Sequence, residues 1–479
     1  MVISSSDLYP KSNSRQTGKN QEQLHAFVAS VLEEVNNVPY DTNSIPQENL
    51  DLANKFRTSL FPWRGQFSPE LIELFLEEYS QKDTVVLDPF VGSGTILFEA
   101  SAKGLTCYGA EINPSAIEMA KSAHFTNIPG SERKEVIQAA LEVAKESVSP
   151  FIWDLFSAPE TELRSPEEFN ACFESIFRAM LRNVEDKPLV HNILVNGIIR
   201  FMNLKLPRTA TDFLLALREH CKIIENLPYS EKDCKVFHSD ARTIPLPDKS
   251  VNLIITSPPY INVFNYHQNN RPAMELVGWD LLAIAKSEIG SNRKNRQNRF
   301  LTVVQYALDM LDTLHEMRRL VCQDGRVILV VGRESNVRGV SFNNGLLVAA
   351  LAVGGAGYHL EMRQERKFKN KFGDIIYEEI LHLVPTCESD ILGDEFARSV
   401  ARWFLLKASK SVADEQVCME ALDAKEHARN VPKSPLFNPT LHPYKILGKS
   451  IKNYIRQLLS NEPLDEETVL DRGYFFAVL

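Results

Sequence analysis

The sequence contains few cysteines, and their spacing excludes two common ways of stabilising a protein. Only seven cysteines occur among the 479 residues, and no two form a CxxC pair. This pattern argues against a structural zinc site and against a disulfide framework, and it is typical of proteins in a reducing compartment. We therefore expect a chain that is stabilised by its hydrophobic core.

Long apolar runs are also missing from the sequence. No stretch of about 18 or more apolar residues occurs, so we expect neither a membrane-spanning segment nor a membrane partner. The first twenty residues are polar and lack the apolar core of a signal peptide. Together these absences predict a cytoplasmic protein.

The chain has no overall excess of positive charge. Its formal net charge is -9, which does not favour a nucleic-acid partner, because phosphate contacts require Lys and Arg. One local exception is the segment 286–299, which contains five basic residues and one acidic residue. A basic patch of this kind can outweigh the overall charge.

The sequence pattern predicts one α/β domain that is interrupted by helices. A short apolar run at 84–88 is followed by a Gly-rich turn, a helix at 94–103 and a second strand at 105–111. This order is the repeating unit of a doubly wound, mostly parallel sheet of the Rossmann-like class. Further strands are predicted at 235–238, 251–256, 326–331, 358–362 and 376–384. Helices are predicted at 21–35, 70–79, 114–125, 303–320 and 342–353.

We divide the chain into five parts on these patterns. They are a polar N-terminal extension (1–50), the first part of the α/β domain (51–130), a helical insertion (131–232), the second part of the α/β domain (233–387) and a C-terminal helical region (388–479). The first twenty or so residues are expected to be disordered.

The Gly-rich turn Asp88-Pro-Phe-Val-Gly-Ser-Gly-Thr95 is the first motif that indicates chemistry. Glycines at the end of a strand let the backbone approach a ligand, and the following helix directs its first amides toward it. The turn lacks the GK[ST] ending of a phosphate-binding loop. An acidic residue at this position suits a cationic ligand, such as the sulfonium and amino groups of S-adenosylmethionine. The alternative is an ordinary tight turn.

Two further acidic residues follow predicted strands. Glu111 ends the second strand, about 20 residues after the turn, where a carboxylate can accept hydrogen bonds from ribose hydroxyls. Asp240 follows the third strand and could accept a hydrogen bond from an adenine amino group. The alternatives are a solvated carboxylate for Glu111 and a helix N-cap for Asp240.

The motif Thr256-Ser-Pro-Pro-Tyr260 directly follows an apolar strand. Two prolines cannot lie in the middle of a strand, so they predict a stiff loop at the carboxyl end of the sheet. The Ser257 hydroxyl and the Pro258 carbonyl could both accept hydrogen bonds from an exocyclic amine, while Pro258 and Pro259 present no competing N–H group. Tyr260 could stack on a base that has been flipped out of a duplex.

These motifs resemble those of the DNA amino-methyltransferases, the N4-cytosine and N6-adenine methylases. The segment Phe61-Pro-Trp-Arg-Gly-Gln-Phe-Ser-Pro69 and the helix after it resemble the remaining cofactor segment of that family. The resemblance implies S-adenosylmethionine as the cofactor and a class I methyltransferase fold, with neither a catalytic metal nor a covalent enzyme intermediate. The residues expected to bind the cofactor are Phe67, Ser68, Pro69, Asp88, Pro89, Phe90, Gly92, Ser93, Gly94, Thr95, Glu111 and Asp240.

The resemblance also indicates a substrate. Family members with Ser in the catalytic motif usually act on cytosine N4, so Ser257 favours methylation of double-stranded DNA at a flipped cytosine, in a restriction system. Adenine N6 remains an alternative. Guanine N2 in RNA is a second alternative, because the Gly-rich turn is similar to that of tRNA guanine-N2 methylases. A non-catalytic nucleic-acid-binding module is a third. Many N4 members carry the two motifs in the opposite order, which leaves the target-recognition region open.

The segment 265–299 is the first candidate for reading the nucleic acid, because it follows the Ser-Pro-Pro loop. The side chains expected to contact DNA are Asn265, His267, Gln268, Arg271, Arg293, Lys294, Arg296 and Arg299. The alternative is a solvated loop. The helical insertion is the second candidate; it could equally be a packing element or form a homodimer interface. Lysines at 367–371 could add phosphate contacts.

Overall fold

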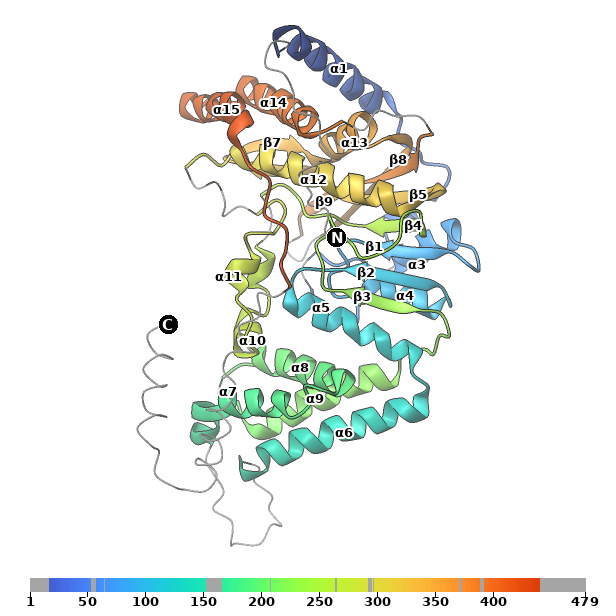
Figure 1. Ribbon diagram of the computed structural model, residues 1–479, viewed down its shortest axis with the longest axis vertical. Coiled ribbons are helices and arrows are strands. Elements are labelled where there is room, and N and C mark those ends of the chain that lie inside the picture. The colour runs from blue at the N-terminus through green and yellow to red at the C-terminus, as the bar shows by residue number, and fades with distance from the viewer. Residues whose placement is uncertain are drawn as a thin grey trace, which may run out of the picture.

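The structure, a computed structural model, contains a seven-stranded sheet with helices on both faces (Figure 1). It describes residues 17–52, 57–63, 65–151, 166–206, 208–262, 265–291, 295, 297–369, 373–387 and 392–439. The strands are β1 Val85–Asp88, β2 Thr106–Ala110, β3 Cys234–Phe237, β4 Val251–Thr256, β5 Val321–Gly332, β8 Tyr358–Lys369 and β9 Ile375–Pro385. Their order is β3-β2-β1-β4-β5-β9-β8. Strands β1 to β5 pair in parallel, and β9 is antiparallel to both of its neighbours. The predicted fold class is confirmed.

The two faces of the sheet are covered by different sets of helices. In β1, Val86 packs with the helices α3 Pro69–Tyr79, α4 Thr95–Ala102 and α5 Pro114–Lys121. The next residue, Leu87, packs with α12 Leu301–Leu320 and α13 Asn344–Gly355 on the other side. Successive strand residues point to opposite faces, so a strand buried on both faces reads as a continuous apolar run.

Both ends of the described chain join this domain. Helix α1 Thr17–Asn37 buries Val28, Val31 and Leu32 against α13 and α14 Asp394–Ser411. Helix α15 Glu415–His427 packs on α14 (Figure 1). Helices from the predicted N-terminal extension and C-terminal region therefore share one hydrophobic core with α12 and α13. The first sixteen residues and those after 439 lie outside the described part of the chain.

The helical insertion packs against the sheet domain. Its helices are α6 Gly130–Val148, α7 Pro166–Arg182, α8 Pro188–Met202 and α9 Ala210–Glu225, which form a bundle below α5 (Figure 1). Its core includes Phe169, Phe177 and Phe213, all fully buried. From α8, Asn192 and Asn196 each donate a side-chain N–H to the backbone carbonyl of Glu118 in α5. These contacts favour the interpretation of the insertion as a packing element.

The structure contains a longer strand and several short elements that the sequence pattern did not predict. Strand β8 continues to Lys369, because polar residues past 362 pair with β9. The remaining elements are α2 Gln47–Leu50, α10 Arg271–Leu276, α11 Leu281–Ile284, the hairpin strands β6 Glu334–Val337 and β7 Val340–Asn343, and the short 3-10 helices Ser122–Asn127, Ser149–Phe151, Tyr266–Gln268 and Ala428–Asn430. No helix in the described ranges has the length and apolar character needed to cross a membrane.

The strand order reverses at β1, and this reversal positions the site. Strand β1 lies between β2 and β4, so their helical connections leave the sheet on opposite faces and a crevice opens at their carboxyl ends. The Gly-rich turn follows β1, and the Ser-Pro-Pro loop follows β4. Motifs that are far apart in the sequence are therefore neighbours in space.

Candidate active site

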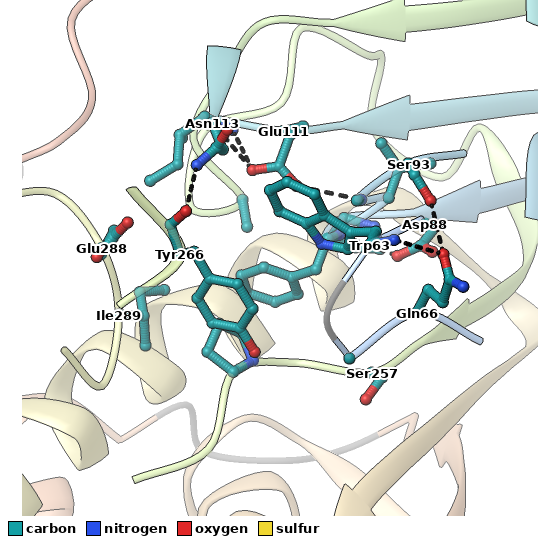
Figure 2. Close-up of a pocket in the computed structure, with 18 of the residues that line it drawn as sticks. Trp63, Gln66, Asp88, Ser93, Glu111, Asn113, Ser257, Tyr266, Glu288 and Ile289 are labelled. Atoms are coloured by element: carbon teal, nitrogen blue, oxygen red, sulfur yellow. Dashed lines mark hydrogen bonds between the residues drawn. The ribbon is translucent and has the colours of Figure 1, made fainter. Parts of the chain in front are cut away.

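A narrow cavity lies at the carboxyl ends of β1, β2 and β4 (Figure 2). Trp63 and Tyr266 stack across it, with 6.4 Å between ring centroids, and Asp88, Glu111 and Ser257 surround them. The predicted residues that line the cavity are Phe67, Asp88, Pro89, Phe90, Gly92, Ser93, Thr95, Glu111, Asp240, Ser257 and Pro259. The fold therefore brings the Gly-rich turn, Glu111, Asp240 and the Ser-Pro-Pro loop to one cavity.

Asp88 links the Gly-rich turn to the strand that carries Ser257. Its Oδ1 accepts hydrogen bonds from the Thr256 hydroxyl, at 2.5 Å, and from the Phe90 backbone N–H, at 2.9 Å. Burial raises the pKa of Asp88 to about 7, and these two hydrogen bonds oppose the rise. The carboxyl group is thus held in place at the end of β1 with only neutral donors around it.

Glu111 holds the other side of the Gly-rich turn. Its Oε2 accepts from the Gly92 N–H at 3.1 Å, and its Oε1 accepts from the Ile112 and Asn113 N–H groups at 2.9 and 2.8 Å. Burial raises the pKa of Glu111 to about 7, with a smaller contribution from the nearby Asp88 carboxyl. The remaining lone pair of Oε2 is available to a ligand hydroxyl.

The surroundings of these two carboxyl groups suit a cationic ligand. Burying a carboxylate with no compensating cation disfavours its ionised form, and every hydrogen-bond donor to Asp88 and Glu111 is a backbone N–H or a hydroxyl. A sulfonium or ammonium group placed between them would stabilise both carboxylates. Gly94 keeps the turn tight: its φ is +94°, and a Cβ there would lie 2.9 Å from the Ala120 Cα.

Asp240 is placed differently from the sequence-based prediction. It lines the cavity, but Arg242 donates three N–H bonds to its carboxylate and the Phe437 N–H donates a fourth. These donors use the four acceptor positions of the carboxylate and leave none for an adenine amino group. Asp240 instead fixes the C-terminal segment 431–437 against the sheet, a contact between residues nearly 200 positions apart.

Ser257 lies where the narrow cavity meets a second, wider cleft. This cleft has a volume of about 1040 Å³ and is bordered by Ser257, Tyr260 and the β8–β9 hairpin. The Ser257 Oγ lies 3.3 Å from the Tyr260 hydroxyl oxygen, and Pro258, the next residue of the loop, is buried. Ser257 can therefore contact one group in the narrow cavity and another in the wide cleft.

The upstream segment contributes unevenly to the two spaces. Phe67 borders both, whereas Ser68 borders only the wide cleft and donates its hydroxyl to Glu70 at 2.7 Å. Pro69 is buried as the first residue of α3 and lines neither space. Gly94 also lies outside the cavity lining and acts through the shape of the turn. Ser68 and Pro69, which we expected to lie beside the cofactor, therefore do not line the narrow cavity.

The segment 265–299 forms part of the cavity wall. His267 is fully buried, and its N–H and Nδ1 contact the Glu288 carboxylate at 2.6 and 2.9 Å, so it cannot reach a base edge. Arg271 is paired with Glu275 at 2.6 Å, and Asn265 is half-buried.

Two of the described residues that we expected to contact DNA are exposed to solvent. Gln268 and Arg299 are exposed, and the amide of Gln268 hydrogen-bonds to the His267 ring. Arg293, Lys294 and Arg296 lie outside the described residues. The burial of His267 against Glu288 contradicts its predicted contact with DNA. The segment folds back onto the Ser-Pro-Pro loop, where the Asn262 N–H donates to the Gly290 carbonyl at 3.0 Å.

Several cavity residues were not assigned from the sequence. Trp63 and Gln66 belong to the upstream motif, so this motif was the available signal for them. Asn113 caps α5 before a proline, a recognisable helix start, and donates its side-chain N–H to the Tyr266 carbonyl at 3.0 Å. Tyr266 and Glu288 reach the cavity only through the fold of their segment, and no local pattern predicts them.

Comparison with known proteins gives three sets of matches. A family profile described as "DNA methylase", of the N6/N4 type, matches residues 6–122. The chain is 20% identical over 398 residues to the type II methyltransferase M.MjaII of Methanocaldococcus jannaschii, covering 60% of this chain and 74% of that protein. It is 23% identical over 318 residues to the type II methyltransferase M.AvaI of a Nostoc species, covering 54% of this chain and 63% of that protein, which is less than two thirds of its length.

The solved structures that match are more distant. One is a SAM-dependent methyltransferase from Methanosarcina mazei, with 12% identity and a TM-score of 0.29, covering 66% of this chain and 98% of the other. Another is the PH0226 protein of Pyrococcus horikoshii, with 13% identity and a TM-score of 0.28, covering 66% and 88%.

The strand order and the acidic Gly-rich turn at its reversal point define a Rossmann-like, S-adenosylmethionine-dependent methyltransferase. The family profile and the two type II relatives narrow this class further. Over the matched residues the chain is similar to the DNA amino-methyltransferases of the N4/N6 type.

The affinity for S-adenosylmethionine is expected to increase with pH through about 7. In the free protein the pKa of Asp88 and that of Glu111 are both about 7, so at lower pH a cationic cofactor must displace protons from these acids. The dissociation constant should fall as pH rises and level off above this range. Titration calorimetry in buffers of different ionisation enthalpy would measure both affinity and proton release. A pH-independent affinity without proton release would contradict the prediction.

The free protein should show the opposite trend in its stability. A carboxyl group whose pKa is raised by folding stabilises the folded state at acidic pH, and this contribution is lost as pH rises through about 7. Saturating cofactor should remove that loss, so the difference in Tm between the bound and free protein is expected to grow with pH.

Proposed function

We propose that this protein transfers a methyl group from S-adenosylmethionine to N4 of cytosine in double-stranded DNA, as the modification enzyme of a restriction system. The observation that carries the proposal is the position of Ser257 between the narrow cavity and the wide cleft. The type II relatives support the assignment to a restriction system, and the Ser in the motif supports cytosine. Such a role places the protein with the nucleoid in a prokaryotic cytoplasm.

The reaction that we propose depends on activating a poor nucleophile. When bound, S-adenosylmethionine supplies an electrophilic methyl group. The exocyclic amine of cytosine has its lone pair conjugated into the ring, so it must be drawn toward tetrahedral geometry before it can react. The Ser257 Oγ and the Pro258 carbonyl are the acceptors that we assign to its two N–H groups. Because prolines at 258 and 259 have no N–H, the loop presents no donor that would compete.

The wide cleft is the space that we assign to the target nucleotide. A base inside a duplex cannot reach a buried site, so the nucleotide must rotate out of the stack, and Tyr260 offers a ring on which it can rest. Lys367 and Lys369 line the same cleft, where their ammonium groups could contact the phosphates beside the flipped base. We assign phosphate contacts to this hairpin in addition to the exposed Gln268 and Arg299.

Product analysis tests the proposal directly. The protein would be incubated with S-adenosylmethionine labelled in the methyl group and unmethylated duplex DNA, and the DNA would then be digested to nucleosides. We expect label in N4-methylcytosine. Label in N6-methyladenine would keep the mechanism and correct the base. Label in RNA alone would overturn the DNA assignment, and failure to bind the cofactor would favour a non-catalytic module.

A further inference from the structure

Glu378 places a half-buried carboxyl group, with 16% of its side chain exposed, behind the Ser-Pro-Pro loop. It lies in β9, opposite Gly332 of β5 and Arg366 of β8. Because Gly332 has no side chain, the Tyr260 ring can lie against its backbone; a Cβ at this position would be 2.7 Å from the Tyr260 Cε2. The Tyr260 hydroxyl thereby reaches the Glu378 Oε1 at 3.3 Å. A continuous chain of polar atoms therefore runs from Ser257 through Tyr260 to Glu378.

The number of hydroxyl hydrogens determines the direction of the hydrogen bonds from Ser257 through Tyr260 to Glu378. An ionised carboxylate can only accept hydrogen bonds, so Tyr260 must donate its single hydroxyl hydrogen to Glu378. The Tyr260 oxygen can then only accept from Ser257, whose Oγ lies 3.3 Å away. The Ser257 Oγ then keeps lone pairs that can accept, and Ser257 borders both spaces. A carboxylate at position 378 thus makes Ser257 an acceptor, which is what an amine substrate requires.

We propose that Glu378 is a positioning residue that acts through Tyr260: it orients the Ser257 hydroxyl as a hydrogen-bond acceptor and takes up the proton that leaves the target amine. The inference rests on the proposed function, because it assumes an amine at Ser257. It adds a residue from β9, the second strand from the edge of the sheet and more than 100 positions from the loop, to the machinery of methyl transfer.

The series of hydrogen bonds from Ser257 to Glu378 accounts for the proton that leaves the target amine. Transfer of the methyl group forms the N–C bond, breaks the S–C bond of the cofactor and leaves a positive charge on the target nitrogen. That nitrogen gives one proton to the Ser257 Oγ, Ser257 gives its own hydroxyl proton to the Tyr260 oxygen, and Tyr260 gives its proton to the Glu378 carboxylate. The amine product becomes neutral, and Glu378 becomes a neutral acid that can release its proton into the wide cleft.

The groups around Glu378 determine how this step depends on pH. Burial raises the pKa of Glu378 above its ordinary value, and Arg366 and the Tyr260 hydroxyl oppose the rise. The Arg366 Nε lies 3.6 Å from the Glu378 Oε2, while β5 contributes the uncharged Gly332. The other charged groups that line the cleft are Asp51, Glu334, Lys367 and Lys369. Only ionised Glu378 can accept the proton, so turnover should be lost as pH falls through this raised pKa.

Kinetics of single and double variants test the proposal. Glu378→Gln can still accept a hydrogen bond from Tyr260 but cannot accept its proton, and Tyr260→Phe keeps the ring while removing the hydroxyl. We expect each variant to lower kcat by about 100-fold, as is usual for loss of a proton acceptor, with little change in KM for DNA. Glu378→Gln should also remove the acidic limb of the pH profile. Glu361→Gln removes a carboxylate from the remote part of β8 and is the matched control.

A double-variant cycle distinguishes action through Tyr260 from a structural role. The two residues form one chain, so the double variant should be no slower than Tyr260→Phe alone. Additive losses, or an unchanged pH profile in Glu378→Gln, would overturn the proposal. Thermal unfolding and cofactor binding of each variant would identify any that fail to fold.

An infrared titration of Glu378 provides a readout that needs no activity. The carboxylic acid band lost in Glu378→Gln should titrate above the ordinary range for Glu, and Tyr260→Phe should shift this pKa further upward, because it removes a hydrogen bond that favours the carboxylate. No shift would overturn the chain. If the wild-type protein methylates no nucleic acid, the proposed function fails while this measurement still tests the contact between Tyr260 and Glu378.

Discussion

Replacing Ser257 with alanine should lower kcat for methyl transfer by roughly 100- to 1000-fold, the usual effect of removing one positioned hydrogen-bonding group from an active site. The hydroxyl lies between the two cavities, and its lone pairs are the acceptors that we assign to the target amine. The dissociation constant for S-adenosylmethionine should change less than about twofold, since the carboxyl groups that suit the cationic cofactor remain in place. Single-turnover rates together with cofactor titrations would measure the two effects separately.

The matched control for this prediction is Ser250→Ala at the other end of the same strand. Its hydroxyl donates to the Pro247 carbonyl, far from both cavities. This variant should retain wild-type turnover and cofactor affinity. Equal turnover by Ser257→Ala and the wild type would remove Ser257 from the reaction, whereas a large loss of cofactor affinity would reassign it to the cofactor cavity.

Replacing Asp88 with alanine should weaken the binding of S-adenosylmethionine by about 10- to 100-fold. This range corresponds to the loss of one charge-assisted hydrogen bond of about 1.5–3 kcal/mol. The variant also removes the acceptor for the buried Thr256 hydroxyl, which holds the end of β4 against the Gly-rich turn. We therefore expect a lower Tm and a slower methyl transfer at saturating cofactor. Calorimetric titration and thermal unfolding would measure both.

Asp88→Asn separates the charge from the hydrogen bond. Its amide oxygen can still accept from Thr256 and Phe90, so stability should be largely kept, while cofactor affinity should fall and lose part of its dependence on pH. Asp83→Ala is the control in the exposed turn before β1, where the side chain pairs with Lys232 at 3.1 Å. If Asp88→Asn binds the cofactor like the wild type at every pH, the carboxylate plays no electrostatic role in binding.

Much of the fold follows from local sequence patterns. The apolar run 84–88 is buried on both faces of the sheet, so its composition alone predicts a central parallel strand, and β1 lies there. The glycines at 92 and 94 both have positive φ, which explains why this turn is recognisable as a motif. Apolar runs and glycine-rich turns can be recognised in the sequence because each reflects the local backbone conformation and burial of its own strand or turn.

The sequence was less informative wherever a residue's partner lies far along the chain. Asp240 has the position of a cofactor ligand, yet the N–H of Phe437, 197 positions further along the chain, donates to its carboxylate together with the neighbouring Arg242. His267 has a side chain of the type that can contact a base, yet Glu288 binds it inside the cavity wall. Neither partner could be assigned from spacing, because folding brings them together by burying apolar surface elsewhere.

By itself, the sequence determined the class of fold, the Gly-rich turn, the Ser-Pro-Pro loop and the expected cofactor, because each depends on a short run of residues with restricted backbone freedom. Only the tertiary structure decided that Ser257 borders two spaces, that the N- and C-terminal helices belong to one domain, and that Glu378 lies behind Tyr260. The physical reason is the order of the strands. It brings the ends of β1 and β4 together and places β9 beside β5, and the packing of both sheet faces determines that order.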